Sequence, residues 1–328
     1  MSEDENPAAA SGEGAAAPLC FLVGEDLAGE RIDRALAELC NLPRAQVVRW
    51  IALGRVRIGA SVVPRPSRRV QEGDRLEADP PEISEPRVAP EAIALEILYE
   101  DSDLVVIDKA AGMVVHPAPG HPTGTLVNAL LHHCGDLAGV GGVLRPGIVH
   151  RLDRGTSGVM VAAKNDFSHA ALARQFHDHT IERVYRAAVR SVPRADEGRV
   201  DRPIGRHLRD RKKMSVRSRS GRPAATRWRV IERFPASRTA WLEIRPETGR
   251  THQIRVHLAS IGLPLCGDAT YGRARKARGG AGRGLDRPAL HAAVLGFEHP
   301  RSGEDLRFEA PLHADLAAFL ARCRAGEK

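Results

Sequence analysis

The stretch GIVHRLDRGTSGVMVAA, residues 147–163, places a single acid between two apolar runs. The runs 147–149 and 159–163 are apolar and rich in β-branched residues, which predicts a buried strand on each side. Residues 154–158 between them are of types that allow a tight reversal of the chain. We therefore expect Asp153 at a strand end, where a carboxylate can act as a nucleophile. The alternative is an aspartate that only hydrogen-bonds its own turn.

Composition and charge limit the kind of protein. The chain has 328 residues, enough for one large domain and a small one, with a net charge of +8 and a pI near 9.6. This positive excess favours a polyanionic partner. No stretch approaches the roughly eighteen apolar residues of a membrane span, and the acidic N-terminus lacks the positive charge of a secretion signal. These features predict a soluble, cytoplasmic protein with no membrane partner.

The chain divides by composition into four segments. Residues 1–17 lack apolar periodicity, which predicts a disordered tail. Residues 18–80 show two amphipathic helical patterns and short alternating strands, which predict a small α/β-type unit of two helices on a sheet. A proline-punctuated linker is expected at 81–93, and the main domain at 94–328. In the main domain, strands and helices do not alternate strictly, which favours an α+β fold on a mixed, largely antiparallel sheet flanked by helices.

The first unit contains RIDRAL, PRAQVVRWIALGRVRIG and VQEGDRL in that order. On these pieces it resembles the S4 RNA-binding domain, although the turn after the strand reads Gly59-Ala60 where Asn-Gly is usual. Four arginines are expected to form a basic edge that follows a phosphate backbone: Arg44, Arg49, Arg55 and Arg57. The alternative for each is a solvated helix face.

Three motifs carry a second resemblance: VVIDKAAGMVVHP at 105–117, GIVHRLDRGTSGVMVAAK at 147–164 and ETGRTHQIRVHLASIGLPLCGDATYG at 247–272. With them the main domain resembles the catalytic domain of the RluA/RluD family of RNA pseudouridine synthases. The S4-like unit in front is similar to the subgroup that modifies large-subunit ribosomal RNA, with the greatest likeness to the RluD subgroup, whose substrate is the helix 69 stem-loop of 23S rRNA. Ala110 and Gly155 depart from the family pattern, where proline and an acid are common.

The resemblance implies an isomerase that breaks the N1–C1′ bond of uridine, turns the base and rejoins it through C5. It makes Asp153 the nucleophilic carboxylate, Tyr185 the aromatic that packs on the target ring, and Arg255 the basic partner of the acid. A nearby arginine favours the charged form of a buried carboxylate. The alternatives are an exposed helix residue for Arg255 and a half-buried strand aromatic for Tyr185.

Further residues are candidates for RNA binding. On a strand, Arg151 shares a face with Asp153, so we expect it to fill the gap left by the flipped nucleotide or to clamp its phosphate, whereas His150 faces away and is structural. Residues 199–229 hold twelve Lys or Arg against two Asp, which favours contact with RNA over a merely solvated loop. The centre of that run is Arg211, Lys212 and Lys213.

No metal and no cofactor are expected. Five cysteines are scattered without the spacing of a metal finger, and the histidine pairs His132–His133 and His177–His179 do not share a helical face. The chain also lacks a glycine-rich phosphate-binding fingerprint, and an isomerisation of uridine needs no energy input.

The expected partner is 23S ribosomal RNA or a pre-50S particle, bound by a monomer. Three alternatives remain open at this point. One is a synthase that acts on other ribosomal or transfer RNA uridines, and another is a non-catalytic RNA-binding factor of ribosome assembly. The third, a metal-dependent nuclease, would need clustered acids that are absent near Asp153 in the sequence.

Overall fold

The computed structural model describes residues 18–40, 42, 44–80, 88–118, 120–135, 137, 140, 146–210, 213–218, 220–272 and 285–326. The chain splits into two compact units between residues 85 and 86. This division falls inside the segment 81–93 that the sequence marks as a linker. Within the described residues, no helix is both long and apolar enough to cross a membrane.

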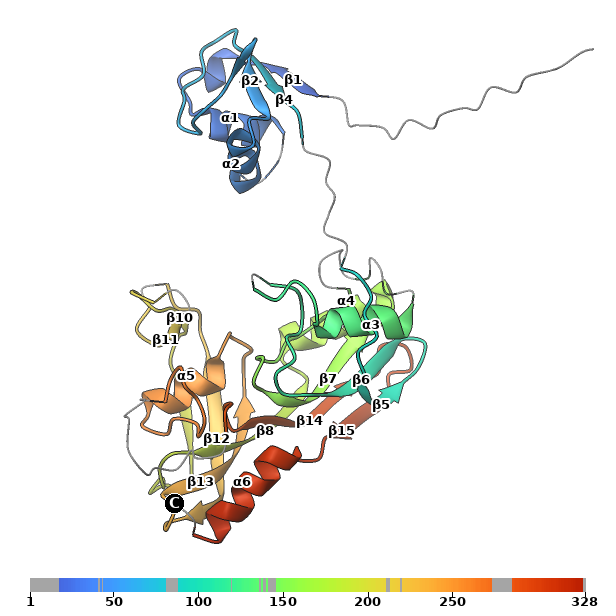
Figure 1. The fold of residues 1–328 in the computed structure, drawn as a ribbon, viewed down its shortest axis with the longest axis vertical. Coiled ribbons are helices and arrows are strands. Elements are labelled where there is room, and N and C mark those ends of the chain that lie inside the picture. Colours follow the sequence, from blue (N-terminus) through green and yellow to red (C-terminus); the bar gives the residue numbers. More distant parts are fainter. Residues whose placement is uncertain are drawn as a thin grey trace, which may run out of the picture. The chain divides into compact units, whose positions relative to one another are not determined.

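The smaller unit packs two helices on an antiparallel sheet (Figure 1). The strands, in sheet order, are β1 (Leu19–Leu22), β4 (Arg75–Ala78), β2 (Val56–Ile58) and β3 (Ser61–Val62). The helical elements are a 3-10 turn η1 (Glu25–Leu27), α1 (Ile32–Leu39) and α2 (Arg44–Ala52). Their apolar faces are buried in one core, to which Leu36, Ile51 and Leu76 belong. The helical periodicity therefore predicted both helices, while β1 was not predicted.

The larger unit is built on one nine-stranded sheet (Figure 1). Its strands, in sheet order, are β5 (Glu96–Glu100), β6 (Leu104–Lys109), β7 (Ser157–Ala163), β14 (Leu290–Glu298), β8 (Glu182–Val189), β13 (Thr239–Pro246), β12 (Ala225–Phe234) and β9 (Glu197–Asp201), with β15 (Asp305–Glu309) beside β14. The pair β7–β14 is parallel, and the other described pairs are antiparallel. A separate ribbon joins β10 (Gly205–Arg206) and β11 (Met214–Ser215). The prediction of a mixed, largely antiparallel α+β fold is confirmed.

Helices α3 (Leu126–Cys134) and α4 (Asp166–Asp178) cover opposite faces of β6 and β7. Successive residues of a strand point to opposite sides, so Val105 and Ile107 pack in the core of α3. Leu104 and Val106 pack instead in the core that contains Leu172 of α4. Each apolar side chain of β6 therefore belongs to one of two layers.

The same division continues at β13. Leu242 packs in the core that includes Leu258 of helix α5 (Gln253–Ser260), whereas Trp241 packs with Phe319 of helix α6 (Ala314–Arg324). Tyr185 contacts the cores of α3 and α5, so it lies on their face of the sheet. The candidate catalytic residues gather on this face.

One expected strand is absent. Residues 147–149 form no strand, and only Ile148 makes an isolated bridge, with Ala162. Gly147 has a φ of +70°, outside the strand region, and a Cβ added there would lie 2.4 Å from the carbonyl oxygen of Ala163. The prediction of a strand before Asp153 is therefore wrong, while the strand after it is confirmed as β7.

Candidate active site

Asp153 lies in an irregular segment that leads into β7. Its backbone carbonyl closes the turn by accepting the N–H of Thr156 at 3.0 Å. Its side chain, 17% exposed, points elsewhere: Oδ2 accepts a hydrogen bond from Nη1 of Arg255 at 3.0 Å. The turn is thus held by the backbone, which leaves the carboxylate available for chemistry.

Arg255 lies on α5 and bridges two acids. Its Nε and Nη2 donate to Asp268 Oδ2 and Oδ1 at 2.7 and 3.0 Å, and its Nη1 donates to Asp153. The side chain is 9% exposed, so the alternative of an exposed helix residue is wrong. Burial alone would lower the pKa of Arg255, but the hydrogen bonds and charge of Asp268 outweigh it and raise that pKa. Arg255 therefore stays charged beside Asp153.

Asp268 fixes the position of Arg255 and was not predicted from the sequence. It lies in the loop after α5 and also accepts the backbone N–H groups of Thr270 and Tyr271 at 2.9 and 3.1 Å. Burial would raise the pKa of Asp268, yet these hydrogen bonds together with Arg255 hold it below its ordinary value. A fixed anion therefore holds the guanidinium that contacts Asp153.

His252 and Tyr271 complete the surroundings of the pair. The guanidinium carbon of Arg255 lies 5.0 Å from the centre of the Tyr271 ring. Tyr271 Oη accepts the N–H of Met214 at 2.9 Å and lies 2.7 Å from His252 Nδ1, so its own proton can be donated to that nitrogen. His252 Nε2 then faces Asp153 Oδ1 at 3.9 Å. Burial lowers the pKa of His252 in spite of the nearby Asp153, which favours a neutral imidazole.

A cavity of about 520 Å³ opens over Asp153. Tyr185 lines it from β8, and burial raises the pKa of its hydroxyl. Five arginines also line it: Arg151, Arg183, Arg222, Arg250 and Arg255. Asp153 is the one acid among the lining residues that the structure describes. A second cavity of about 330 Å³ shares Arg151, Asp153, His252 and Arg255 with the first. The cavity therefore suits an uncharged ring attached to a negatively charged strand.

Arg151 is exposed and lines both cavities together with Asp153. No strand runs through 150–153, so the strand-face argument for this placement is wrong, although the two residues do share a cavity. His150 also lines the larger cavity, contrary to expectation, but its ring stacks on Phe176 with centroids 4.3 Å apart. Its Nε2 accepts the N–H of Val161 at 3.2 Å, so the ring is held in place.

The arginines of the smaller unit differ in their partners. Arg44 donates to the buried Asp33 at 2.8 and 3.0 Å, and Arg55 pairs with Asp79. Arg49 and Arg57 are exposed and have no acid partner within the described part of the chain. These last two are therefore the better candidates for contact with RNA.

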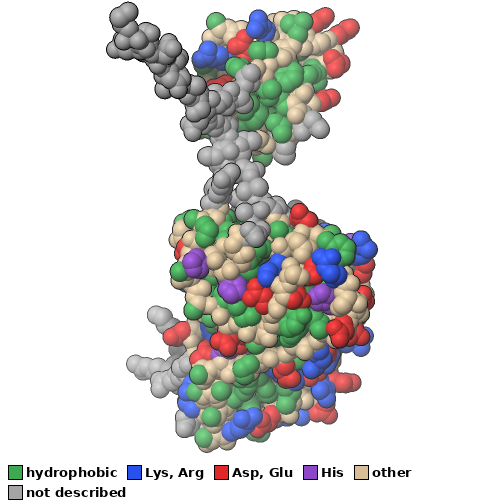
Figure 2. Space-filling view, turned by 90° about the vertical axis from the view of Figure 1, so that its right-hand side faces the viewer, with side chains coloured by type: hydrophobic (Ala, Val, Ile, Leu, Met, Phe, Trp, Pro, Cys, Tyr) green, Lys and Arg blue, Asp and Glu red, His purple; other side chains and the backbone are tan. Residues whose placement is uncertain are grey.

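The basic run 199–229 is less available than its charge suggests. Arg199 and Arg227 pair with Glu247, Arg229 pairs with Glu243, and Lys213 lies 3.4 Å from Asp210. Arg211 and Lys212 lie outside the described residues. On the face drawn in Figure 2, basic and acidic side chains are likewise interspersed over the larger unit. Part of the run therefore pairs with acids of the protein itself.

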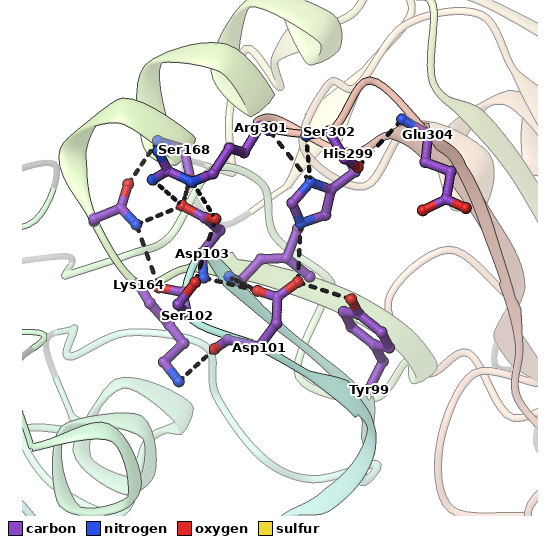
Figure 3. A network of polar contacts seen from close by, with 12 residues as sticks. Tyr99, Asp101, Ser102, Asp103, Lys164, Ser168, His299, Arg301, Ser302 and Glu304 are labelled. Carbon is purple, nitrogen blue, oxygen red and sulfur yellow. Dashed lines mark hydrogen bonds and ion pairs between the residues drawn. The ribbon is translucent and has the colours of Figure 1, made fainter.

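Two groups of side chains have the spacing of metal ligands among the described residues: Glu100 with His133 and Cys134, and Asp101 with Asp103 and His299. Figure 3 shows how the second group is occupied. His299 Nδ1 accepts the N–H groups of Arg301 and Ser302, so the imidazole is neutral and its Nε2 donates to Asp101 at 2.9 Å.

Asp103 is occupied as well. It accepts Nε and Nη2 of Arg301 at 2.7 and 2.6 Å, the Ser168 hydroxyl at 3.0 Å and the Asn165 amide at 2.9 Å. The hydrogen bonds from Arg301 hold the pKa of Asp103 well below its usual range. This network ties the β5–β6 turn to the start of α4 and to the β14–β15 turn, which makes its role structural.

Comparisons with known proteins agree with this geometry. Residues 103–260 match the family model of RNA pseudouridylate synthase, and residues 30–76 match that of the S4 domain. An uncharacterized RNA pseudouridine synthase of Bacillus subtilis, YlyB, is 47% identical over 301 residues, which cover 92% of this chain and 96% of the relative. The ribosomal large subunit pseudouridine synthase D of Zymomonas mobilis is 46% identical over 298 residues, covering 89% and 93%.

A solved structure is also similar. The human RNA pseudouridylate synthase domain containing 4 aligns with a TM-score of 0.54 and 30% sequence identity, over 70% of this chain and 93% of that one. The mixed sheet, the acid–arginine pair in its cavity and these likenesses define the class. The chain belongs to the RNA pseudouridine synthase family and has an S4 domain in front of the catalytic part. The non-catalytic and nuclease alternatives are thereby set aside.

Proposed function

We propose that this enzyme isomerises specific uridines of large-subunit (23S) ribosomal RNA, in the helix 69 stem-loop, with Asp153 as the nucleophile. The observation that carries the mechanism is the 3.0 Å contact between Arg255 Nη1 and Asp153 Oδ2, two residues that line a cavity of about 520 Å³. A charged carboxylate in a sheltered site can form a covalent bond to a substrate carbon. We further propose that it acts in the cytoplasm, as a monomer, on the RNA or on a pre-50S particle.

The cavity favours a mechanism in which the target nucleotide is flipped out of the RNA helix. A stacked uridine cannot expose both its glycosidic bond and its C5 atom to one carboxylate, so the base has to leave the helix. Stacking on an aromatic ring contributes roughly 1–3 kcal/mol, which offsets part of the few kcal/mol that flipping costs. Tyr185, on β8, lines the same cavity as Asp153 and can supply this stacking.

The chemistry then follows from the placement of Asp153. Attack of its carboxylate at ribose C1′ or at base C6 would hold one part of the substrate while the N1–C1′ bond is open. The detached uracil turns and C5 bonds to C1′. The bond between Asp153 and the substrate then breaks, which restores the free carboxylate, and the C5 proton is lost as N1 gains one, so the reaction is balanced without a cofactor. Arg255 orients the carboxylate, because its guanidinium is itself fixed by a second contact with Asp268.

The choice of ribosomal RNA rests on the S4 domain and on relatives whose names specify the large ribosomal subunit, such as that of Zymomonas mobilis. Arg49 and Arg57 present unpaired positive charge on the S4 domain within the described residues. A second candidate, a synthase for other ribosomal or transfer RNA uridines, would use the same catalytic site. The two differ only in the RNA recognised.

Two measurements test the proposal. Pseudouridine mapping of 23S rRNA, from cells with and without the gene, is expected to show loss of signal in helix 69. Loss of signal only at other sites would overturn the proposed substrate, while the proposed isomerisation of uridine would stand. Asp153→Asn in the full chain is expected to abolish product formation and to leave RNA binding within about threefold, because a neutral amide is a poor nucleophile. Turnover by this variant would refute the role of Asp153.

A further inference from the structure

Arg183 is one of the five arginines that line the cavity and plays no part in the chemistry above. It lies two residues before Tyr185 on β8, so both side chains extend from the same face of the strand. Its Nη2 donates to the carbonyl oxygen of Pro246 at 3.3 Å, at the end of β13. Its Nε is buried and has no hydrogen-bond partner among the described residues. Arg183 therefore lines the cavity with a guanidinium whose Nε is unpartnered among the described residues.

The charge of Arg183 also has no counter-ion among the residues that the structure describes. Within the described residues no carboxylate pairs with it, whereas Arg186 on the same strand pairs with Glu243 and Arg255 pairs with two acids. Burial lowers the pKa of Arg183 from its ordinary value, which is the direction expected for a cation taken out of water. A half-buried cation of this kind is costly unless a ligand provides the negative charge.

The geometry limits where that charge can come from. Asp153 is the one acid among the described lining residues, and its Oδ2 is already bonded to Arg255. A uracil ring beside Tyr185 is neutral, so it cannot compensate Arg183. The strand that carries the uracil has one negative phosphodiester for each nucleotide, and the unpartnered donors of a guanidinium match phosphate oxygens.

We propose that Arg183 binds a phosphodiester of the RNA strand next to the flipped uridine and thereby fixes how deeply that nucleotide enters the cavity. The inference rests on the proposed flipping of a uridine into this cavity. It makes Arg183 a binding residue that is distinct from the Asp153–Arg255 pair. It also explains why a cation is kept at a position where no carboxylate of the described residues pairs with it.

The test combines a protein change with a phosphate change. Arg183→Gln and the wild-type full chain are assayed on a synthetic stem-loop that contains the mapped uridine, with single neutral methylphosphonates placed in turn at the phosphates around it. For the wild type, one position is expected to raise KM about ten- to a hundredfold, the loss of a charge-assisted contact. For Arg183→Gln on unmodified RNA we expect a similar rise, and no further rise when that same phosphate is neutral.

Additional variants separate binding from folding. Arg183→Lys keeps the charge without the planar fork and is expected to recover part of the affinity. Arg174→Gln, at an exposed arginine of α4 that does not line the cavity, is the control and should change KM less than twofold, as expected for a solvated charge. The midpoint of thermal unfolding of Arg183→Gln should equal or exceed that of the wild type, because an uncompensated cation is removed.

Three results would overturn the inference. One is that the rises in KM from Arg183→Gln and from each methylphosphonate are additive at every position, which would mean that Arg183 contacts no phosphate. Another is that Arg183→Gln has the same KM as the wild type on unmodified RNA. The third is a lower unfolding midpoint with unchanged KM, which would make the residue structural. In each case the wild type would still form pseudouridine, so the proposed function would stand independently.

Discussion

Arg255 joins Asp153 to Asp268: Nη1 lies 3.0 Å from the first carboxylate, and Nε and Nη2 lie 2.7 and 3.0 Å from the second. The two acids are 115 residues apart in the chain, and both lie against one guanidinium. Because Asp268 is itself fixed by two backbone N–H groups, the guanidinium cannot turn toward solvent. The orientation of the candidate nucleophile is thus set by a loop that does not touch it.

Asp268→Asn tests this relationship. With one acid lost, Arg255 is free to shift, and a misplacement of about 1 Å costs about a hundredfold in kcat. Breaking a buried ion pair also lowers the free energy of unfolding by about 3 kcal/mol. Single-turnover assays and urea unfolding measure the two effects. The control is Asp201→Asn, at an exposed acid, which should lower the free energy of unfolding by less than about 0.5 kcal/mol. If Asp268→Asn kept the kcat of the wild type, the positioning role of Asp268 would be contradicted.

His150 gives the protein a pH-dependent stability. Burial lowers the pKa of His150 to about 3 from its ordinary value of 6.5. Between these values the unfolded chain binds a proton that the folded protein does not, so stability is complete above about pH 6.5 and falls as the pH drops toward 3, by about 1.4 kcal/mol per unit. His150→Gln keeps an acceptor for Val161 N–H without this proton.

The measurement is urea unfolding of the wild type and His150→Gln at pH 7 and at pH 4.5. Carboxylates are common to both proteins, so their contribution cancels in the difference. We expect the free energy of unfolding of the variant, relative to that of the wild type, to be larger at pH 4.5 than at pH 7. Parallel curves for the two proteins would show that His150 does not titrate in this way.

Removal of metal is expected to have no effect. In the group formed by Asp101, Asp103 and His299, all the nitrogen atoms of His299 and the oxygens of both acids already have hydrogen-bond partners (Figure 3). Dialysis of the full chain against EDTA should leave product formation within about twofold and the unfolding midpoint within about 1 °C. A metal ion stabilises the folded protein only if it binds to it, so removing an ion that is not bound changes nothing. Inactivation that Zn²⁺ or Mg²⁺ reverses would identify a metal requirement.

Gly158→Ala is expected to prevent folding. Gly158 has a φ of +114°, and a Cβ there would lie 2.1 Å from the carbonyl oxygen of Ala292 on β14. The strands would have to separate at the parallel pair, which we expect to cost more than about 4 kcal/mol. Circular dichroism and soluble yield report the result. Ala162→Ser, at a small buried residue of the same strand, is the milder comparison; a stable, active Gly158→Ala protein would contradict the role of this close approach.

Much of the fold could be predicted from the sequence because it depends on local patterns. The apolar spacing in residues 32–39 and 44–52 predicted two helices, and the apolar run at 159–163 predicted a buried strand. The strand at 147–149 was wrong because the positive φ of Gly147 bends the chain before Ile148, and glycine spacing does not show which glycine takes that conformation. Strands β9, β14 and β15 were not predicted as strands at all.

The site was predictable only in part, for a physical reason. Asp153 was singled out by its local pattern and the roles of Tyr185 and Arg255 came from a family resemblance, whereas their shared cavity depends on contacts between distant segments. Asp268 was missed although it lies in the quoted motif at 247–272, because nothing in local periodicity distinguishes an acid that holds an arginine from a solvated one. His252 and Tyr271 were missed for the same reason.

The close contact of Gly158 with Ala292 has a wider consequence for heat inactivation. The segment that carries Asp153 is held at Gly147 by Ala163 and at Gly158 by β14, so both of its ends belong to the central sheet. It cannot melt as an independent lid, because its release requires the sheet itself to open. On heating, catalytic activity and tertiary structure should therefore be lost in the same transition. No lower temperature is expected at which the protein is folded but inactive.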